Sequence, residues 1–168
     1  MSNDTRPDYS AYLTRLSKAL AHRGDRAALR RYWSETTRHQ SYPVLGKLGA
    51  LEDKRKTILA ALYAEHPEQR VGISIGKGAL RLGKREDGNH PYDKHFRRLL
   101  ASDDLDDLAQ QLHRLVKRLS REGIGIDYEL LQKNLNFWAN YREDVKLRWA
   151  ADFWQADIPN DNPQALDA

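Results

Sequence analysis

The chain has 168 residues, and 28 Lys and Arg against 24 Asp and Glu give it a formal net charge of +4. Hydrophobic residues make up 40% and charged residues 31%, which is typical of a globular protein and not of a disordered one. The absence of cysteine excludes a disulfide scaffold, a zinc finger, an iron–sulfur cluster and a thiol nucleophile. Because the sequence has no run of 18 apolar residues and no apolar signal segment near Met1, we expect no membrane span and a cytoplasmic location.

Hydrophobic periodicity and the positions of the six prolines predict an all-α chain. In chain order, helices are expected at 8–22, 25–37, 52–65, 76–83, 91–100, 103–121, 127–139 and 142–156, with a short helical turn near 43–49. Val71, Ile73 and Ile75 alternate like a strand, but a single short strand without a partner is unstable, so no sheet is expected.

These elements predict one compact helical bundle of about eight helices over residues 8–156, which could divide into two packed sub-bundles. The sub-bundles would cover about 8–83 and 91–156. Residues 157–168 contain acidic side chains and no basic one, and are predicted to form a flexible tail.

The clearest amphipathic pattern lies in the helix expected at 103–121. With Leu105 at 0° and 100° per residue, the apolar side chains fall between about 280° and 20° and the basic ones between about 120° and 220°. These basic side chains are Arg114, Lys117, Arg118 and Arg121. We therefore expect one face of this helix to pack and the opposite face to be cationic. The helix expected at 91–100 repeats the pattern, with Arg97 and Arg98 pointing largely away from its apolar face.

The helix expected at 25–37 is predicted to bury Leu29, Tyr32 and Trp33 and to carry Arg26 and Arg30 on one exposed side. All four tryptophans of the chain fall at helical spacing with Leu and Ala. This spacing favours core packing of the tryptophans over stacking on nucleic-acid bases.

The sequence gives little support for catalysis or for a metal site. Its six histidines are scattered without a metal-binding spacing, and the acidic cluster at 103–107 is explained by the start of a helix. The segment Gly72–Gly78 resembles a phosphate loop, but it has three residues between its first two glycines and Gly78 where Ser or Thr should follow Lys77. We therefore expect a protein that is not an enzyme and that requires no metal or other cofactor.

Basic side chains on several predicted helices could neutralise the phosphates of nucleic acid. The same side chains could also be ordinary solvent-exposed charges. Arg114 and Arg121, for example, lie toward the C-terminus of a helix whose first turn is acidic, so they also complement the helix dipole. The charge pattern alone leaves both interpretations open.

Six segments follow one another in a recognisable order: Gly24–Arg31, Gly72–Leu80, Asp93–Leu100, Leu112–Val116, Gly125–Tyr128 and Trp138. Together, over about residues 10–156, they resemble the CasB small subunit of the type I-E CRISPR Cascade complex. The loop at 83–90 and the acidic tail have no clear counterpart in that family, and no function is assigned to them.

This resemblance implies an all-helical, non-catalytic subunit of a crRNA-guided complex in antiviral defence. In that family two copies lie head to tail and contact the backbone and large subunits, while a basic surface holds the crRNA–target region and the displaced DNA strand and stabilises the R-loop. By position, the resemblance implies nucleic-acid binding by Arg26, Arg30, Arg31, Lys77, Arg97, Arg98, Arg114 and Arg118, and helical geometry adds Lys117 and Arg121. The alternative is a protein-interaction module whose arginines pair with acidic partner subunits.

Overall fold

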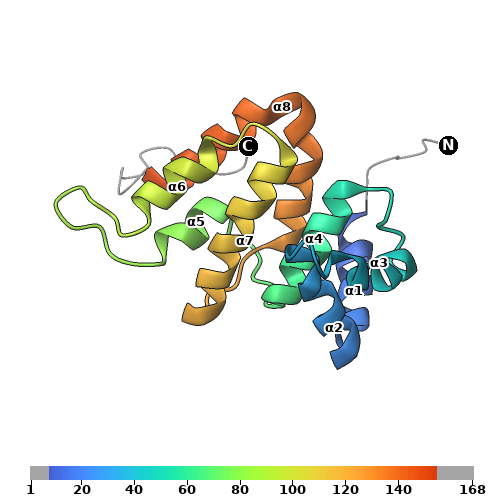
Figure 1. Ribbon diagram of the computed structural model, residues 1–168. Coiled ribbons are helices and arrows are strands. Elements are labelled where there is room, and N and C mark those ends of the chain that lie inside the picture. The colour runs from blue at the N-terminus through green and yellow to red at the C-terminus, as the bar shows by residue number, and fades with distance from the viewer. Residues whose placement is uncertain (1–7, 155–168) are drawn as a thin grey trace.

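The computed structural model describes residues 8–154, which fold into α-helices joined by loops, the most extended of which links α5 and α6 (Figure 1). The elements are α1 (Tyr9–Leu20), α2 (Arg23–Arg30), η1 (Arg31–Trp33), η2 (Arg38–Ser41), α3 (Tyr42–Lys47), α4 (Lys54–Glu65), α5 (Ile75–Leu80), α6 (Asp93–Leu100), α7 (Leu105–Glu122) and α8 (Tyr128–Trp154), where η marks a 3-10 helix. Over the described residues there is no strand, only two isolated β-bridges. The all-α prediction is therefore confirmed, and the tail predicted at 157–168 lies outside the described residues.

Figure 1 shows α1 to α4 gathered toward one end of the molecule and α5 to α7 toward the other. Helix α8 contacts α1 and α4 in the first group and α5 in the second, and α4 also packs on α7. Buried side chains from all eight α-helices join one hydrophobic cluster. The division into sub-bundles between residues 83 and 91 stays a prediction. None of the helices within residues 8–154 is long and apolar enough to cross a membrane.

Helix α4 lies at the centre of this cluster. Eight consecutive residues, from Thr57 to Ala64, are buried, so the helix is enclosed on every side. Three of the eight are alanines, whose small side chains let α1, α2, α7 and α8 approach it closely. Thr57 is the one polar residue in this run besides Tyr63. The Thr57 hydroxyl donates a hydrogen bond to the Ala50 carbonyl oxygen at 2.6 Å.

The acidic cluster before α7 stabilises the start of that helix. Asp104 is the N-cap, and its carboxylate accepts a hydrogen bond from the Asp107 backbone N–H at 2.8 Å. At the other end Gly123 adopts a left-handed conformation with φ of 68°, which glycine tolerates without steric strain. The described residues contain no group of three or more His, Cys, Asp or Glu that could hold a metal ion. The N-cap hydrogen bond of Asp104 agrees with the helix-start interpretation of this cluster.

The single helix expected at 25–37 is wrong beyond Arg30, where α2 ends and the chain continues as the 3-10 helix η1. In this region side chains donate hydrogen bonds to backbone carbonyl oxygens that would accept from backbone N–H groups in a longer helix. The Thr37 hydroxyl donates to the Arg31 carbonyl oxygen at 2.9 Å, and Arg38 Nε donates to the Tyr32 carbonyl oxygen at 2.9 Å. Trp33 is held on α4 by a 3.2 Å hydrogen bond from its indole N–H to the Ala61 carbonyl oxygen.

The two helices expected at 127–139 and 142–156 correspond to the two halves of α8, which are separated by a kink. The kink lies at Tyr141, whose φ of −131° and ψ of 38° are not helical. Trp138 and Trp149 lie on opposite sides of the kink, and their rings stack with centroids 5.9 Å apart. Both are buried, so the core-packing interpretation of these two tryptophans is confirmed.

Helix α5 approaches the second half of α8 so closely that only glycine fits at position 76. A Cβ atom on Gly76 would overlap the Trp149 carbonyl oxygen and would lie 2.8 Å from Asp152 Cβ. Next to this contact, the Ser74 hydroxyl donates to Asp152 Oδ2 at 2.6 Å and accepts from the Lys77 backbone N–H at 3.1 Å. The glycine-containing segment at 72–78 thus serves helix packing.

Candidate nucleic-acid interface

The basic face predicted for residues 103–121 is present on α7. Its apolar side chains are buried in the core, and its basic side chains are exposed on the opposite side. They face the start of α6 across a shallow depression of about 210 Å³, the α6–α7 depression. Its lining residues are Tyr92, His95, Arg114, Lys117, Arg118 and Arg121. None of these six residues is acidic, so the depression is suited to an anion.

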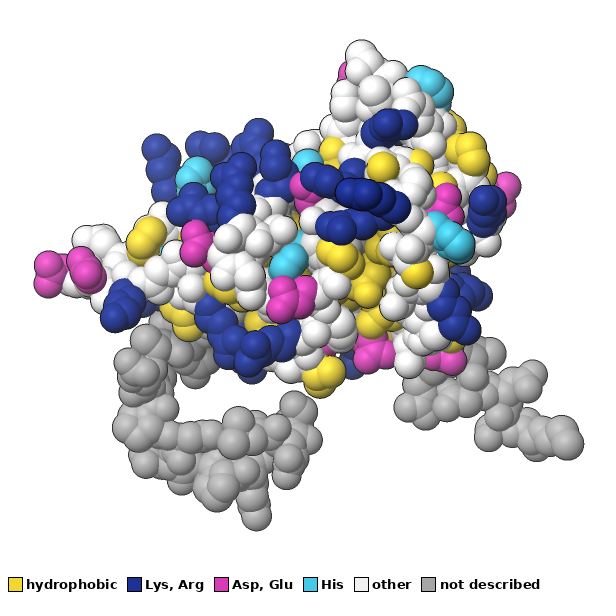
Figure 2. Space-filling model, turned by 90° about the horizontal axis from the view of Figure 1, so that it is seen from below, with side chains coloured by type: hydrophobic (Ala, Val, Ile, Leu, Met, Phe, Trp, Pro, Cys, Tyr) yellow, Lys and Arg dark blue, Asp and Glu magenta, His cyan; other side chains and the backbone are white. Residues whose placement is uncertain are grey.

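Figure 2 shows this concentration of charge on one face of the molecule. A dense group of Lys and Arg side chains surrounds a histidine on the part formed by α6 and α7, and a second group of basic side chains lies beside it. Basic side chains gathered in this way raise the local concentration of a polyanion and speed its association.

The four basic residues of α7 occupy successive turns of the helix. From Arg114 to Arg121 the helix rises by about 10 Å, at 1.5 Å per residue. With about 3.4 Å between charges along one nucleic-acid strand, this length matches roughly three phosphates. A row of this kind contacts backbone and carries no information about base sequence.

Tyr92 and His95 were not predicted as site residues, yet they form the α6 side of the depression. Burial raises the pKa of Tyr92 to about 12, although Arg118 and Arg114 act in the opposite direction. The Tyr92 hydroxyl therefore keeps its proton at neutral pH. The His95 ring lies 5.2 Å from the Tyr92 ring. The sequence signal for this pair was their spacing of three residues, which places both on one side of a helical turn.

The arginines predicted on α2 and just after it make contacts within the chain. Arg26 is partly buried, and its Nε donates to the Ala64 carbonyl oxygen at 3.0 Å. Arg30 Nε lies 3.4 Å from Glu65 Oε2, and Arg31 donates to the Gln40 side chain at 2.6 Å. Each of these arginines therefore has a structural partner in the folded protein.

Glu65 joins three parts of the fold. The His113 Nε2 atom of α7 lies 3.6 Å from Glu65 Oε2. Together with Arg30 of α2, His113 lowers the pKa of Glu65 to about 2, against the effect of burial. The His113 ring in turn stacks on Trp33, with ring centroids 4.1 Å apart. This cluster ties α2, α4 and α7 together.

The remaining predicted residues lie on α5 and α6. Arg97 donates to Asp93 Oδ2 at 2.6 Å and lies 5.1 Å over the Trp154 ring, so it stabilises the packing of α6 on α8. Arg98 and Lys77 are exposed, but neither lines the α6–α7 depression. Of the ten predicted residues the structure thus brings four together at the depression, and the binding role of all ten stays a prediction.

The fold and this surface define a small helical protein with a basic face. The family model described as CRISPR-associated protein Cse2 matches residues 25–154 of the chain. The chain therefore belongs to the CRISPR-associated Cse2 family. Among curated protein sequences, no match was found.

Several solved structures are similar to this fold. CasB from Thermus thermophilus is 24% identical, with a TM-score of 0.71, and the match covers 89% of this chain and 99% of that one. CasB from Thermobifida fusca is 20% identical, with a TM-score of 0.67, over 86% of this chain and 96% of that one. A chain of a CRISPR RNA-guided surveillance complex is 24% identical, with a TM-score of 0.61, over 88% and 91% of the two chains.

Proposed function

We propose that this protein is a non-catalytic small subunit of a type I-E, crRNA-guided CRISPR surveillance complex in the cytoplasm. Its partners are the backbone and large subunits of the complex, a second copy of itself, the crRNA and the target DNA. In this role its basic surface holds nucleic-acid backbone and stabilises the R-loop. Family membership and the similarity to a chain of an RNA-guided surveillance complex support the placement in such a complex.

The α6–α7 depression is the single observation that carries the binding role. Four basic side chains on consecutive turns of α7 surround it without any acidic lining residue. The displaced strand and the guide–target duplex change sequence with every target. Binding that serves all targets must therefore rely on charge and not on base contacts. Arg98 and Lys77, which are exposed on neighbouring helices, extend the proposed surface. Arg26, Arg30, Arg31 and Arg97 contribute less, because each is already engaged within the chain.

The direct test is the salt dependence of single-stranded DNA binding by the isolated protein. If about three to five phosphates are contacted, log K against log salt should have a slope of roughly −2 to −3.5. The variant Arg114→Ala/Arg118→Ala should reduce the slope by about 1.4 in magnitude, since each phosphate contact contributes about 0.7 on single strands. Fluorescence anisotropy with unrelated DNA sequences measures both the slope and the expected lack of sequence preference.

The matched control is Lys18→Ala/Lys47→Ala, which removes the same charge from exposed positions on α1 and α3. It should leave the slope within experimental error. A flat salt dependence of the wild-type protein, or an equal loss in the control, would contradict binding at the depression.

The same double variant separates nucleic-acid binding from the interaction-module alternative. In the assembled complex, Arg114→Ala/Arg118→Ala should weaken R-loop stability while the subunit still assembles. If the variant protein instead keeps normal DNA binding and is lost from the complex, the arginines pair with acidic partner subunits. Pull-down of the complex and R-loop footprinting distinguish these outcomes.

A further inference from the structure

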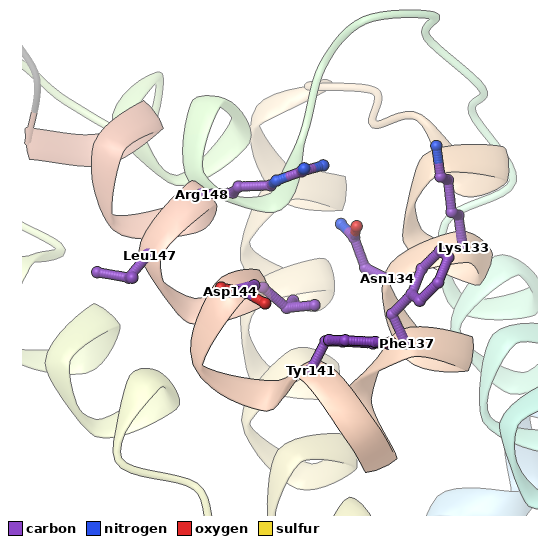
Figure 3. A pocket seen from close by; sticks show the side chains of 8 residues that line it. Lys133, Asn134, Phe137, Tyr141, Asp144, Leu147 and Arg148 are labelled. Atoms are coloured by element: carbon purple, nitrogen blue, oxygen red, sulfur yellow. The ribbon is translucent and has the colours of Figure 1, made fainter. Parts of the chain in front are cut away.

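A second concavity lies at the kink of α8, on a part of the molecule that the proposed nucleic-acid surface does not use. This α8 groove has a volume of about 500 Å³ and is open to solvent (Figure 3). It is lined by Lys133, Asn134, Phe137, Tyr141, Asp144, Val145, Leu147 and Arg148. The kink creates the groove, because it turns the two halves of α8 toward each other at Tyr141.

The groove exposes large apolar side chains to solvent. Phe137 is 40% exposed, Tyr141 54% and Leu147 66%. The rings of Phe137 and Tyr141 lie next to each other, with centroids 5.8 Å apart. Only six large hydrophobic residues in the described part of the chain are exposed to this degree, and three of them line this one groove. Clustering of this kind marks a surface that is covered by another segment or partner.

Charge at the groove favours an acidic occupant. Figure 3 shows the side chains of Lys133 and Arg148 toward one edge and Tyr141 toward the other. Asp144 is the one acidic residue among the eight that line the groove, so the lining carries a net positive charge of one. A segment that combines apolar side chains with carboxylates would fit both properties.

We propose that residues 155–168 of the same chain bind in the α8 groove. This segment follows α8 directly and contains Asp157, Asp161 and Asp167 without any Lys or Arg. It also contains Leu166, which can cover the exposed rings. The segment therefore combines acidic and apolar side chains, which match the positive charge and the exposed apolar side chains of the groove.

The segment is also long enough to reach. From Trp154 back to Tyr141, α8 rises by about 20 Å at 1.5 Å per residue. About six extended residues cover that distance at roughly 3.3 Å each, so residues from about 161 onward can lie in the groove. Pro159 and Pro163 oppose a continuation of the helix away from the groove. Because the segment is tethered to α8, its effective concentration at the groove exceeds that of a separate molecule.

The absence of cysteine makes a site-specific test direct. A nitroxide attached to Ala165→Cys should broaden the backbone amide signals of Phe137, Tyr141 and Leu147 in the full chain. It should leave those of α2 unchanged, and chemical reduction of the nitroxide should restore all signals. The variant Phe137→Ser/Tyr141→Ser should lose the broadening, whereas Leu51→Ser, at a position 53% exposed and outside the groove, should keep it.

Three results would overturn the proposal. One is an absence of broadening at the groove in the full chain. Another is broadening at the groove that persists in Phe137→Ser/Tyr141→Ser. The third comes from a mixture of two chains, one with the spin label and no isotope label, the other with the isotope label and no spin label. If the signals in this mixture broaden as strongly as in a chain that carries both labels, a second copy occupies the groove. All three tests are independent of DNA binding, so they do not depend on the proposed function.

Discussion

Helices α2 and α7 both carry rows of basic side chains, but the fold uses them in different ways. On α2, Arg26 donates to a carbonyl oxygen of α4 and Arg30 lies beside Glu65. On α7, Arg114 and Arg118 lie on the face opposite the core and line an open depression. Basic side chains thus make contacts within the fold on α2 and form an exposed surface on α7.

The difference arises from what lies next to each helix. Helix α2 packs on the C-terminal part of α4, where the Ala64 carbonyl group and the Glu65 carboxylate offer acceptors. The basic face of α7 has only Tyr92 and His95 across the depression, and neither carries a negative charge that could pair with it. A basic row is therefore available to an external anion only where the fold supplies no acceptor.

The largest effect should follow from removing the whole α7 row. The variant with Ala at 114, 117, 118 and 121 should lose the roughly three phosphate contacts of the row, so the salt slope on single-stranded DNA should fall by about 2.1 in magnitude. At about 0.1 M salt this corresponds to a loss of affinity of about a hundredfold. Because these side chains are exposed and Ala favours helix, the free energy of unfolding should change by no more than about 1 kcal/mol. Anisotropy and urea titration measure the two quantities. A loss of less than tenfold would show that α7 is not the main contact.

The next effect concerns stability and tests whether the arginines of α2 serve internal packing. Arg26→Ala/Arg30→Ala should lower the free energy of unfolding by about 2 kcal/mol, mostly through the lost hydrogen bond from a charged donor to Ala64. Urea titration measures this change. Arg23→Ala, at an exposed position on the same helix, is the control and should be close to wild type. If the double variant instead keeps full stability and loses DNA affinity as strongly as the α7 variant, the distinction between the two helices fails.

A smaller, pH-dependent effect is expected at Glu65. The pKa of this carboxyl is lowered from 4.5 to about 2 in the folded protein, so the ionised form stabilises the fold above about pH 4.5. This contribution should be lost as the pH falls from about 4.5 to about 2. Urea titrations of wild type and Glu65→Gln over this range should therefore differ most at the upper end and converge at the lower end. A difference that does not depend on pH would mean that Glu65 acts through packing and not through its charge.

The smallest effect compares two neighbours on α6. Arg98→Ala should reduce the salt slope by up to about 0.7, because its side chain is exposed. Arg97→Ala should change the slope less and lower the free energy of unfolding by a few tenths of a kcal/mol, since Arg97 contacts Asp93 and Trp154. Equal slopes for the two variants would remove the distinction within this helix.

The sequence predicted the features that depend on local pattern. The apolar and basic faces of α7, its acidic start and the break near residue 141 all follow from helical periodicity and from residue types within one segment. The resemblance to the CasB small subunit agrees with the family match and with the observed fold. These properties require no knowledge of which helices are neighbours.

Other features depend on contacts between segments far apart in the sequence. The end of α2 at Arg30 and the hydrogen bond from Trp33 to Ala61 depend on the position of α4. For the same reason the pairing of Arg26 with Ala64 could not be predicted, since 38 residues separate them. Tyr92 was not predicted as a site residue, and only the fold shows that this buried residue borders the α6–α7 depression.

The contact between Gly76 and Trp149 affects the order in which parts of the chain associate during folding. It joins two segments across a long loop that includes α6 and α7, and each doubling of loop length adds about 0.6 kcal/mol to the entropic cost of closure. Helices close in sequence, such as α1 and α2, can associate before such a loop closes. A larger side chain at position 76 would therefore act chiefly on this late step, so that it speeds unfolding more than it slows folding.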